Sequence, residues 1–417
     1  MNKSQLPSLL RAIFQSLLVI LIAVTPANAE NAEARHEWAI ATDSEVARIA
    51  DSLAKLDANF RSGDYGNIDE FLLIKDRKIY AHFRYRNDYW RQFETTLQND
   101  RKLTNQTTYD YSDSFPYNYA HPEWHPYYMG SELHTLQSIS KSVVSILAGI
   151  AIDRKEISSV DVAVVDLLAG CYRIPNRDAS WNMVTLEHLL TMRLNLNWRS
   201  DLPFDDPDNP DTGIEMSDDW VQYTLNLPMR GTPGTSFLYN SGATQLIGAI
   251  LRESTGVDIE EYARRHLFKA LAIDNFYWKQ TPAGPSDALG GLYLKATDLA
   301  KIGQLMIDNG IWAGQRVVSS KWVEDSLYAT TESAIESGDD RHGYGYQWWL
   351  PHDLFGERAF SGLGYGGQLL LGLPDQNVVV VLYGWNPEYE FPAPRKSFRP
   401  MLNEWLINEI LARFESE

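Results

Sequence analysis

The sequence contains a single cysteine, Cys171, among its 417 residues. One thiol cannot form a disulfide within the chain, so the fold gains no covalent cross-link of that kind. No pattern typical of a cysteine nucleophile surrounds Cys171, and we expect it to be a buried structural thiol. A chain of this length, rich in tryptophan, tyrosine and phenylalanine, can instead be stabilised by a large apolar core.

Positive charge is also scarce. The 37 lysines and arginines are outnumbered by 55 aspartates and glutamates, which gives a formal net charge of −18. Such a surface repels nucleic acid and anionic lipid, so we expect neither as a partner. The charge favours solubility but carries no information about the fold.

Long apolar runs are scarce too, and the run near the start is short. The mostly apolar segment 14–24 follows Lys3 and Arg11 and precedes Ala27-Asn28-Ala29. It falls short of the roughly 20 residues that span a bilayer, and this order of features is typical of a secretory signal. An uncleaved membrane anchor is the alternative. We expect a signal peptide over 1–29, one domain over 30–417, a periplasmic or secreted bacterial protein, and no stable membrane insertion after cleavage.

Three common catalytic signatures are absent, namely G-x-S-x-G, H-E-x-x-H and the P-loop, which argues against the corresponding enzyme classes. His121 and His125 flank a proline, so one helix cannot readily present both to zinc. An aspartate-rich loop lacks the glycine and distal glutamate of a calcium loop, and we interpret it as a solvated acidic loop that could border a cleft and select cationic substrates. We expect neither metal nor cofactor. The aspartates of this loop are Asp201, Asp205, Asp206, Asp208 and Asp211.

Apolar spacing along the chain predicts strands near both ends and helices between them. A capping box at Thr42 and Glu45 opens a helix over 43–60. Because the terminal strands flank a helical middle, we expect an α+β fold in which they pair into one antiparallel sheet and residues 138–310 form a helical lobe. The predicted strands are 71–74, 78–85, 344–350, 367–373 and 378–383, and the later helices are 138–153, 186–192, 220–227, 245–254, 259–271, 296–309 and 400–414.

Ser138-Ile139-Ser140-Lys141 opens a strongly apolar predicted helix. Residues three apart lie on one face of a helix, so the Lys141 amine can reach the Ser138 hydroxyl. The first turn of a helix carries unpaired backbone N–H groups and the positive end of the helix dipole, and both favour a developing oxyanion. Ser138 is therefore the candidate nucleophile and Lys141 the candidate base. A helix cap followed by a surface lysine is the alternative.

The same S-x-x-K spelling occurs a second time, at Ser52-Leu53-Ala54-Lys55. Two fixed positions recur by chance about once in a chain of this size. The second copy lies inside the first predicted helix, where no free helix N-terminus exists. Position rather than spelling therefore distinguishes the two copies, and we expect only Ser138 to be catalytic.

Two later segments can supply partners for the serine. Tyr239-Asn240-Ser241-Gly242 lies just before a predicted helix, so Tyr239 can face the serine and pass a proton to the leaving group. Residues 362–368, Gly-Leu-Gly-Tyr-Gly-Gly-Gln, lead into an apolar strand, and their glycines allow a substrate to approach the strand edge closely. The N–H of Tyr365 is the candidate second oxyanion donor. A buried structural tyrosine and a plain hairpin turn are the alternatives.

In this order the three segments resemble the serine β-lactamase, DD-peptidase and esterase superfamily over about residues 40–417. Residues 184–192, 295–303 and 344–349 also resemble stretches of that superfamily. The finer resemblance, carried by residues 239–242 and 366–368, is to the esterase-like and 6-aminohexanoate-dimer-hydrolase-like branch. It implies a β-lactamase/transpeptidase-like α+β fold, with an antiparallel sheet flanked by terminal helices plus a helical lobe, and an acyl-enzyme without a cofactor. The implied roles are nucleophile for Ser138, general base for Lys141, proton relay for Tyr239, oxyanion donors for the N–H groups of Ser138 and Tyr365, and substrate contacts for Ser241, Gly364, Gly366 and Gly367.

Two positions depart from the pattern of that superfamily. The second motif usually has Asn two places after its tyrosine, where this chain has Ser241, and the third usually begins with Lys or His, where it has Gly362. A lysine there would bind the carboxylate of a β-lactam or peptide, so its absence argues against strong activity of those kinds. We expect a serine hydrolase of small amides or esters. A penicillin-recognising DD-peptidase or β-lactamase, and a non-catalytic binding or sensor domain, are the alternatives.

Overall fold

The computed structural model describes residues 37–89, 91, 125–174, 180–199, 202, 206, 208–337, 340–351, 358–386 and 409–414. The predicted signal peptide and most of the aromatic segment before residue 125 lie outside these ranges. Residues Trp38–Glu417 group into one unit. In the part of the chain that the structure describes, no helix is long and apolar enough to cross a membrane.

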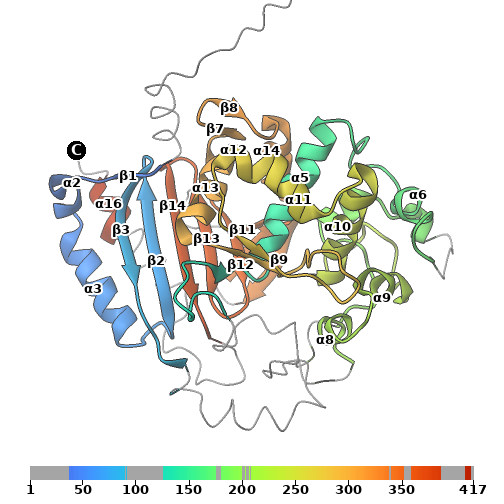
Figure 1. The fold of residues 1–417 in the computed structure, drawn as a ribbon, viewed down its shortest axis with the longest axis horizontal. Coiled ribbons are helices and arrows are strands. Elements are labelled where there is room, and N and C mark those ends of the chain that lie inside the picture. Colours follow the sequence, from blue (N-terminus) through green and yellow to red (C-terminus); the bar gives the residue numbers. More distant parts are fainter. Residues whose placement is uncertain are drawn as a thin grey trace, which may run out of the picture. The chain divides into compact units, whose positions relative to one another are not determined.

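A mixed sheet is the largest element that the described residues form (Figure 1). All neighbouring strands run antiparallel except β1 and β3, which are parallel. In spatial order the strands are β1 (Ala39–Ile40), β3 (Lys78–Arg84), β2 (Ile68–Lys75), β14 (Val378–Gly384), β13 (Gln368–Leu373), β12 (Phe360–Gly364), β11 (Trp349–Pro351), β10 (Asp340–Tyr344) and β9 (Thr331–Ser337).

The pairing of β2 with β14 joins the two ends of the domain, with Leu73 opposite Val380. Strands β2, β14 and β13 are buried on both faces, which explains why 378–383 is a continuous apolar run instead of an alternating one. The prediction that the terminal strands share one antiparallel sheet is confirmed, and the fold is α+β.

Each face of the sheet has its own apolar core. Residues of β2 and β14 that point to one face, including Phe71 and Val380, pack with Leu56 and Phe60 of α3 (Ala50–Arg61). Residues that point to the other face, including Leu72 and Val381, belong to the larger core with the central helices. Figure 1 shows α3 on one side of the sheet and α5, α10 and α13 on the other.

Two long buried helices, α5 (Ile139–Asp153) and α10 (Ser241–Thr255), form the centre of the helical region and pack against each other. Helix α13 (Ala296–Ile307) lies on β13 and β14. The other helices are α2 (Asp43–Ala47), α6 (Val164–Leu168), α7 (Leu186–Leu190), α8 (Pro210–Glu215), α9 (Trp220–Asn226), α11 (Ile259–Ala263), α12 (Lys269–Leu271), α14 (Ser320–Ser326) and α16 (Ala412–Phe414), and the short strands are β4 (His134–Thr135), β5 (Tyr277–Trp278), β6 (Leu292–Leu294), β7 (Ile311–Trp312) and β8 (Gln315–Arg316).

Four predictions about local structure are wrong. The helix expected over 43–60 is two helices, α2 and α3, separated by a turn at Arg48 and Ile49. Because α3 begins at Ala50, Ser52 lies in its first turn, and the prediction that no helix start exists near Ser52 is wrong. The strand expected over 344–350 is divided into β10 and β11 by a turn in which Gln347 has φ +62°. Cys171, expected to be buried, is exposed, and its Sγ lies 2.7 Å from Glu253 Oε2. The helix expected over 400–414 falls mostly outside the described residues.

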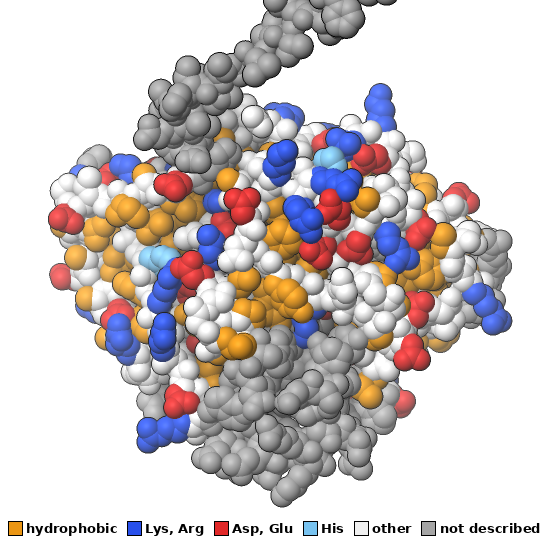
Figure 2. Space-filling model, in the orientation of Figure 1, with side chains coloured by type: hydrophobic (Ala, Val, Ile, Leu, Met, Phe, Trp, Pro, Cys, Tyr) orange, Lys and Arg blue, Asp and Glu red, His pale blue; other side chains and the backbone are white. Residues whose placement is uncertain are grey.

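Acidic and basic side chains are interspersed on the face drawn in Figure 2, with apolar side chains between them. The net negative charge of the chain is therefore not concentrated in one acidic patch on that face.

Candidate active site

The serine of the first motif lies where strand β4 turns into helix α5. The N–H of Ile139 donates to the Leu136 carbonyl (3.2 Å), and Gln137, inside this tight turn, has φ +49°. Ser138 is the N-cap of α5 and is partly exposed, whereas the helix that follows is buried. Its hydroxyl makes no capping hydrogen bond, so the alternative in which Ser138 is an ordinary helix cap does not fit.

Lys141 is buried, with 2% of its surface exposed. Its Nζ donates to Ser138 Oγ at 2.9 Å and to the backbone carbonyl of Leu289 at 2.6 Å. The alternative of a surface lysine is therefore wrong. A hydroxyl and an amine at this distance can exchange a proton, which is the first requirement for an activated serine.

The backbone N–H groups around the serine differ from the expected arrangement. The first-turn N–H groups of Ile139, Ser140 and Lys141 donate to the carbonyls of Leu136, Gln137 and Ser138, so they are not available to an oxyanion. The N–H of Ser138 itself has no acceptor among the described residues. The oxyanion role predicted for the N–H of Ser138 remains a prediction.

Tyr239 lies immediately before α10, whose N-cap Asn240 accepts the N–H of Ala243 at 3.0 Å. The Tyr239 ring stacks on Trp349, with centroids 5.4 Å apart and an interplanar angle of 21°. Lys141 Nζ lies 5.4 Å from the centroid of the Tyr239 ring, within the range of a cation–π contact. The second motif therefore lies at the same site as the first.

The third motif also lies beside the start of α5. A Cβ added to Gly364 would lie 2.4 Å from the Leu136 carbonyl oxygen, and one added to Gly362 would lie 3.0 Å from Ile139 Cγ2. Glycine at these positions lets β12 approach the serine turn closely. Tyr365 then begins the turn into β13 and is partly exposed.

Gly366 and Gly367 continue this turn with φ +82° and +101°, which other residues rarely adopt. This requirement of the turn accounts for glycine at both positions, and the substrate contacts predicted for Gly364, Gly366 and Gly367 remain predictions. The oxyanion role of the Tyr365 N–H also remains a prediction.

Sequence reasoning missed Asp211, which it assigned to a solvated loop. Trp198 Nε1 donates to Asp211 Oδ2 at 3.1 Å, and the Ser241 hydroxyl also hydrogen-bonds this carboxyl group. Burial raises the pKa of Asp211, and the hydrogen bond from Ser241 and the charge of Lys141 partly oppose that effect. Asp208 is exposed, as expected of a solvated loop, and Asp201 and Asp205 lie outside the described residues.

The turn-to-helix signal that places Asp211 is present in the sequence. Asn209 is the N-cap of α8, and its side chain accepts the N–H of Asp211, with Pro210 at the first helical position. Glu215 lies one turn further along the same short helix and is 7% exposed. Burial raises the pKa of Glu215 well above its usual value, and the charges of Asp287 and Asp211 raise it further.

A second buried lysine, Lys279, lies in this environment and is 4% exposed. Burial lowers its pKa to about 7, against the charges of Asp287 and Glu215, which raise it. The site thus has two buried lysines, Lys141 and Lys279, and a set of largely enclosed carboxyl groups. Across the described ranges, no group of three or more His, Cys, Asp or Glu side chains is arranged to hold a metal ion.

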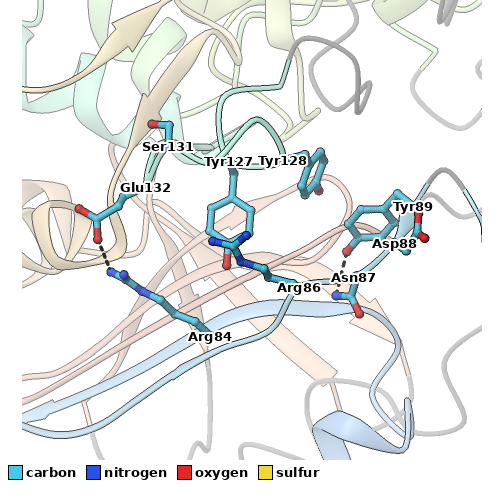
Figure 3. A pocket seen from close by; sticks show the side chains of 10 residues that line it. Arg84, Arg86, Asn87, Asp88, Tyr89, Tyr127, Tyr128, Ser131 and Glu132 are labelled. Carbon is cyan, nitrogen blue, oxygen red and sulfur yellow. Dashed lines mark hydrogen bonds and ion pairs between the residues drawn. The ribbon is translucent and has the colours of Figure 1, made fainter.

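A separate cavity of about 450 Å³ lies between the end of β3 and the turn at 127–132 (Figure 3). Arg84 donates to Glu132 at 2.7 Å across this cavity. Beside it, the buried Asp69 carboxylate accepts hydrogen bonds from Asn87 and Tyr89. The described residues that line this cavity include no nucleophile with an adjacent base, so the serine cluster is the better candidate for catalysis.

An antiparallel sheet and a helical region that meet at an S-x-x-K helix start define the β-lactamase/transpeptidase-like class of fold. The β-lactamase family model matches residues 111–391, and the chain belongs to the β-lactamase family.

The curated proteins that resemble the sequence include a 6-aminohexanoate-dimer hydrolase and a β-lactamase. Over 274 residues the chain is 29% identical to the 6-aminohexanoate-dimer hydrolase of Paenarthrobacter ureafaciens, a match that covers 60% of this chain and 66% of that relative. Over 151 residues it is 28% identical to a β-lactamase of Escherichia coli (strain K12), covering 36% of each. The chain therefore spans less than two thirds of the length of either relative.

Solved structures share the fold at low sequence identity. A penicillin-binding protein homologue from Caulobacter crescentus has a TM-score of 0.61 at 14% identity, covering 90% of this chain and 98% of that one. An octameric penicillin-binding protein homologue from Pyrococcus abyssi has a TM-score of 0.59 at 18% identity, covering 87% and 77%. At these identities the likeness establishes the fold alone.

Proposed function

We propose that the protein is a serine hydrolase that cleaves small amides or esters through an acyl-enzyme on Ser138. The observation that carries the proposal is the 2.9 Å contact between Lys141 Nζ and Ser138 Oγ at the start of a buried helix. A structural lysine in this position would be expected to reach solvent, whereas this one is buried against the hydroxyl. The family and the name of the Paenarthrobacter relative support hydrolysis of an amide.

The proposed reaction has two halves. Neutral Lys141 takes the proton of Ser138 as its Oγ attacks the carbonyl carbon, and the N–H groups of Ser138 and Tyr365 bind the resulting oxyanion. The tetrahedral intermediate collapses and the bond to the leaving group breaks, while the proton held by Lys141 passes through Tyr239 to the departing nitrogen or oxygen, which leaves as an amine or alcohol. Water then attacks the acyl-enzyme, releases the acid and returns the proton to Ser138.

Gly362 supports substrates without a carboxylate near the scissile bond. The superfamily's usual Lys or His is missing from this position, and a Cβ here would already lie 3.0 Å from Ile139 Cγ2. The packing at this point therefore favours a residue without a side chain, and a carboxylate lacks its usual cationic partner. We propose simple esters and short amides ahead of β-lactams and D-Ala-D-Ala peptides.

Covalent capture tests the proposal most directly. A fluorophosphonate probe should add its phosphonyl group to Ser138 of the wild type, with a matching increase in intact mass, and should leave Ser138→Ala unmodified. Ser52→Ala is the matched control, because it removes the serine of the other S-x-x-K sequence, and it should be labelled like the wild type. Absence of labelling in the wild type would favour a non-catalytic binding or sensor domain.

A substrate screen then separates the remaining alternatives. We expect turnover of p-nitrophenyl acetate, p-nitrophenyl butyrate and short amide oligomers. A long-lived adduct with fluorescent penicillin, without ester or amide turnover, would instead favour a penicillin-recognising DD-peptidase or β-lactamase.

We also propose that the protein is exported and that residues 1–29 are removed. The charge, apolar segment and small residues of that stretch support the proposal. Mass spectrometry of protein recovered from the periplasm or medium should find Glu30 as its first residue. A chain that retains residues 1–29 in the membrane fraction would support the anchor alternative.

A further inference from the structure

The carbonyl that holds Lys141 belongs to a tight turn over residues 287–291, just before β6. The Asp287 side chain organises this turn, because its Oδ1 accepts the N–H groups of both Leu289 and Gly290 at 2.9 Å. Asp287 is fully buried. The carbonyl between these two N–H groups, that of Leu289, receives Lys141 Nζ at 2.6 Å.

Backbone contacts fix the base of the same turn. The N–H of Asp287 donates to the Lys279 carbonyl at 2.8 Å, and Trp278 Nε1 donates to the Asp287 carbonyl at 2.7 Å. The N–H of Ala288 donates to Gln245 Oε1 of α10 at 3.0 Å. The turn is therefore tied to β5 and to α10, and the orientation of the Leu289 carbonyl depends on the Asp287 carboxylate.

A third tie links the turn directly to the helix that carries the nucleophile. The N–H of Leu292 donates to Ser140 Oγ at 3.2 Å, and Ser140 lies between Ser138 and Lys141 on α5. The hydrogen bonds made by Lys141 and Ser140 thus hold the 287–291 turn at a fixed distance from the start of α5.

The direction of the Lys141 amine matters for the proposed chemistry. To accept the proton of Ser138, the neutral amine must aim its lone pair at Ser138 Oγ. When one N–H of the amine donates to the Leu289 carbonyl, rotation about the Cε–Nζ bond is fixed. The lone pair can then stay directed at Ser138 Oγ. A displaced carbonyl would let the amine rotate away, and misplacement of a catalytic group by about 1 Å can cost roughly 10²-fold in rate.

We propose that Asp287 is a positioning residue for the general base, acting through the Leu289 carbonyl on Lys141. The proposal rests on the proposed function, since it concerns the same proton transfer. Asp287 would act as a hydrogen-bond acceptor for two backbone N–H groups and would not touch the substrate. Its effect should therefore appear in the acylation rate and kcat, with little change in KM.

Two variants of Asp287 test this role in the enzyme. Asp287→Ala removes the acceptor and should lower the fluorophosphonate labelling rate and the kcat for p-nitrophenyl butyrate by about 10- to 100-fold. KM should stay within about threefold, because binding contacts are unchanged. Asp287→Asn keeps an acceptor oxygen at the same place and should restore most of the rate. Rates are expressed per folded protein, determined by circular dichroism.

Asp219→Ala is the matched control. Asp219 Oδ1 accepts the N–H groups of Val221 and Gln222 at 3.0 Å, an arrangement of the same kind at the start of α9. Its loss should lower the unfolding temperature without changing kcat. A purely structural role for Asp287 would give the same pattern as this control, and that result would overturn the proposal.

A different substitution decides the matter if Asp287→Ala does not fold. A Cβ added to Gly291 would lie 2.7 Å from Asp287 Cβ and 2.9 Å from both its Cγ and its backbone carbonyl oxygen, so Gly291→Ala displaces Asp287 without removing its carboxylate. A folded Gly291→Ala with a reduced labelling rate supports the proposal, and one with the wild-type rate overturns it. An Asp287→Asn variant as slow as the alanine variant would also overturn it, because charge would then be the cause.

The outcomes separate this inference from the proposed function. If the wild type is not labelled on Ser138, the proposed function fails and Asp287 is irrelevant to it. If the wild type is labelled and Lys141→Met is not, but Asp287→Ala reacts at the wild-type rate, only the positioning role fails.

Discussion

Two segments of this chain have the same S-x-x-K spelling and opposite surroundings. Ser52 lies within α3, and its buried Oγ is 3.1 Å from Glu409 Oε2, while Lys55 is exposed. Ser138 lies ahead of the first residue of α5, and Lys141 is buried against its Oγ. The first pair places its hydroxyl and amine in different environments, and the second brings them into contact.

The difference between the two copies comes from the rest of the fold. In the copy at Ser138 the carbonyl of Leu289, from a distant segment, accepts the lysine amine, and glycines of β12 allow close packing around the serine turn. In the copy at Ser52 the serine lies in the first turn of α3, which begins at Ala50, and the lysine is exposed. Both serines therefore lie at or near a helix start, and the acceptor that a distant segment supplies to Lys141 is what distinguishes the Ser138 copy.

The largest expected effect separates the two serines. Ser138→Ala should lower kcat for p-nitrophenyl butyrate by about 10⁴-fold or more, because the proposed nucleophile is lost. Ser52→Ala should leave kcat within about twofold and cost about 0.5–1.5 kcal/mol of stability, the usual value of one hydrogen bond. Steady-state kinetics and urea unfolding measure both. Equal rates in Ser138→Ala and the wild type would remove Ser138 from the mechanism.

The two lysines should differ by a smaller factor. Lys141→Met keeps an unbranched side chain but removes the proposed base, and we expect kcat to fall by about 10³-fold. Lys55→Met should change kcat by less than about twofold, since that side chain is exposed. Full activity of Lys141→Met, measured in the same assay, would show that another group accepts the proton.

Tyr239 marks a further contrast, because its ring faces Lys141 and not Lys55. Tyr239→Phe keeps the ring that stacks on Trp349 and removes only the hydroxyl. We expect kcat to fall by about 10²-fold with amide substrates, and less with p-nitrophenyl esters, whose leaving group needs no proton. A uniform loss across both substrates would argue against the relay and for a structural role of the hydroxyl.

The smallest expected effect is on stability, and it comes from Lys279. This lysine is buried, whereas Lys55 is exposed. Between its folded pKa of about 7 and its ordinary value of 10.5, Lys279 binds a proton in the unfolded chain but not in the folded one. The free energy of unfolding should therefore increase by up to about 1.4 kcal/mol per pH unit as pH rises through this window. Below pH 7 the whole destabilising effect of burying Lys279 is present.

Lys279→Met should remove this slope, and Lys55→Met should retain it. Urea unfolding at pH 7, 8 and 9 measures the difference between each variant and the wild type. Below pH 10 the buried tyrosines do not interfere, because their ionisation in the unfolded chain begins near that pH. An unchanged slope in Lys279→Met would assign the pH dependence to other groups.

Much of the fold followed from local patterns. The apolar runs around 71–74 and 378–383 predicted buried strands at both ends, and the apolar pattern after Ser138 predicted the buried helix α5. These features depend on neighbours within a few residues, so the sequence alone expresses them.

The features that were missed depend on distant contacts. Asp211 seemed one of several solvated aspartates, and its enclosure depends on Trp198 and on Ser241 of another helix. The largely apolar sequence of 344–350 does not indicate the turn at Gln347. The Gln347 side chain accepts a hydrogen bond from Thr244 and donates one to the Leu189 carbonyl. No local pattern could have identified Leu289 as the acceptor for Lys141.

The pairing of β2 with β14 has a consequence for the timing of biosynthesis. On the ribosome, Ser138 and Lys141 are made long before residues 378–384, yet β2 cannot complete its sheet until those residues emerge. The glycine-rich strand that packs beside the serine turn also arrives late. A nascent chain should therefore be catalytically silent until residues 378–384 have been made, and such long-range strand pairing makes the final closure slow.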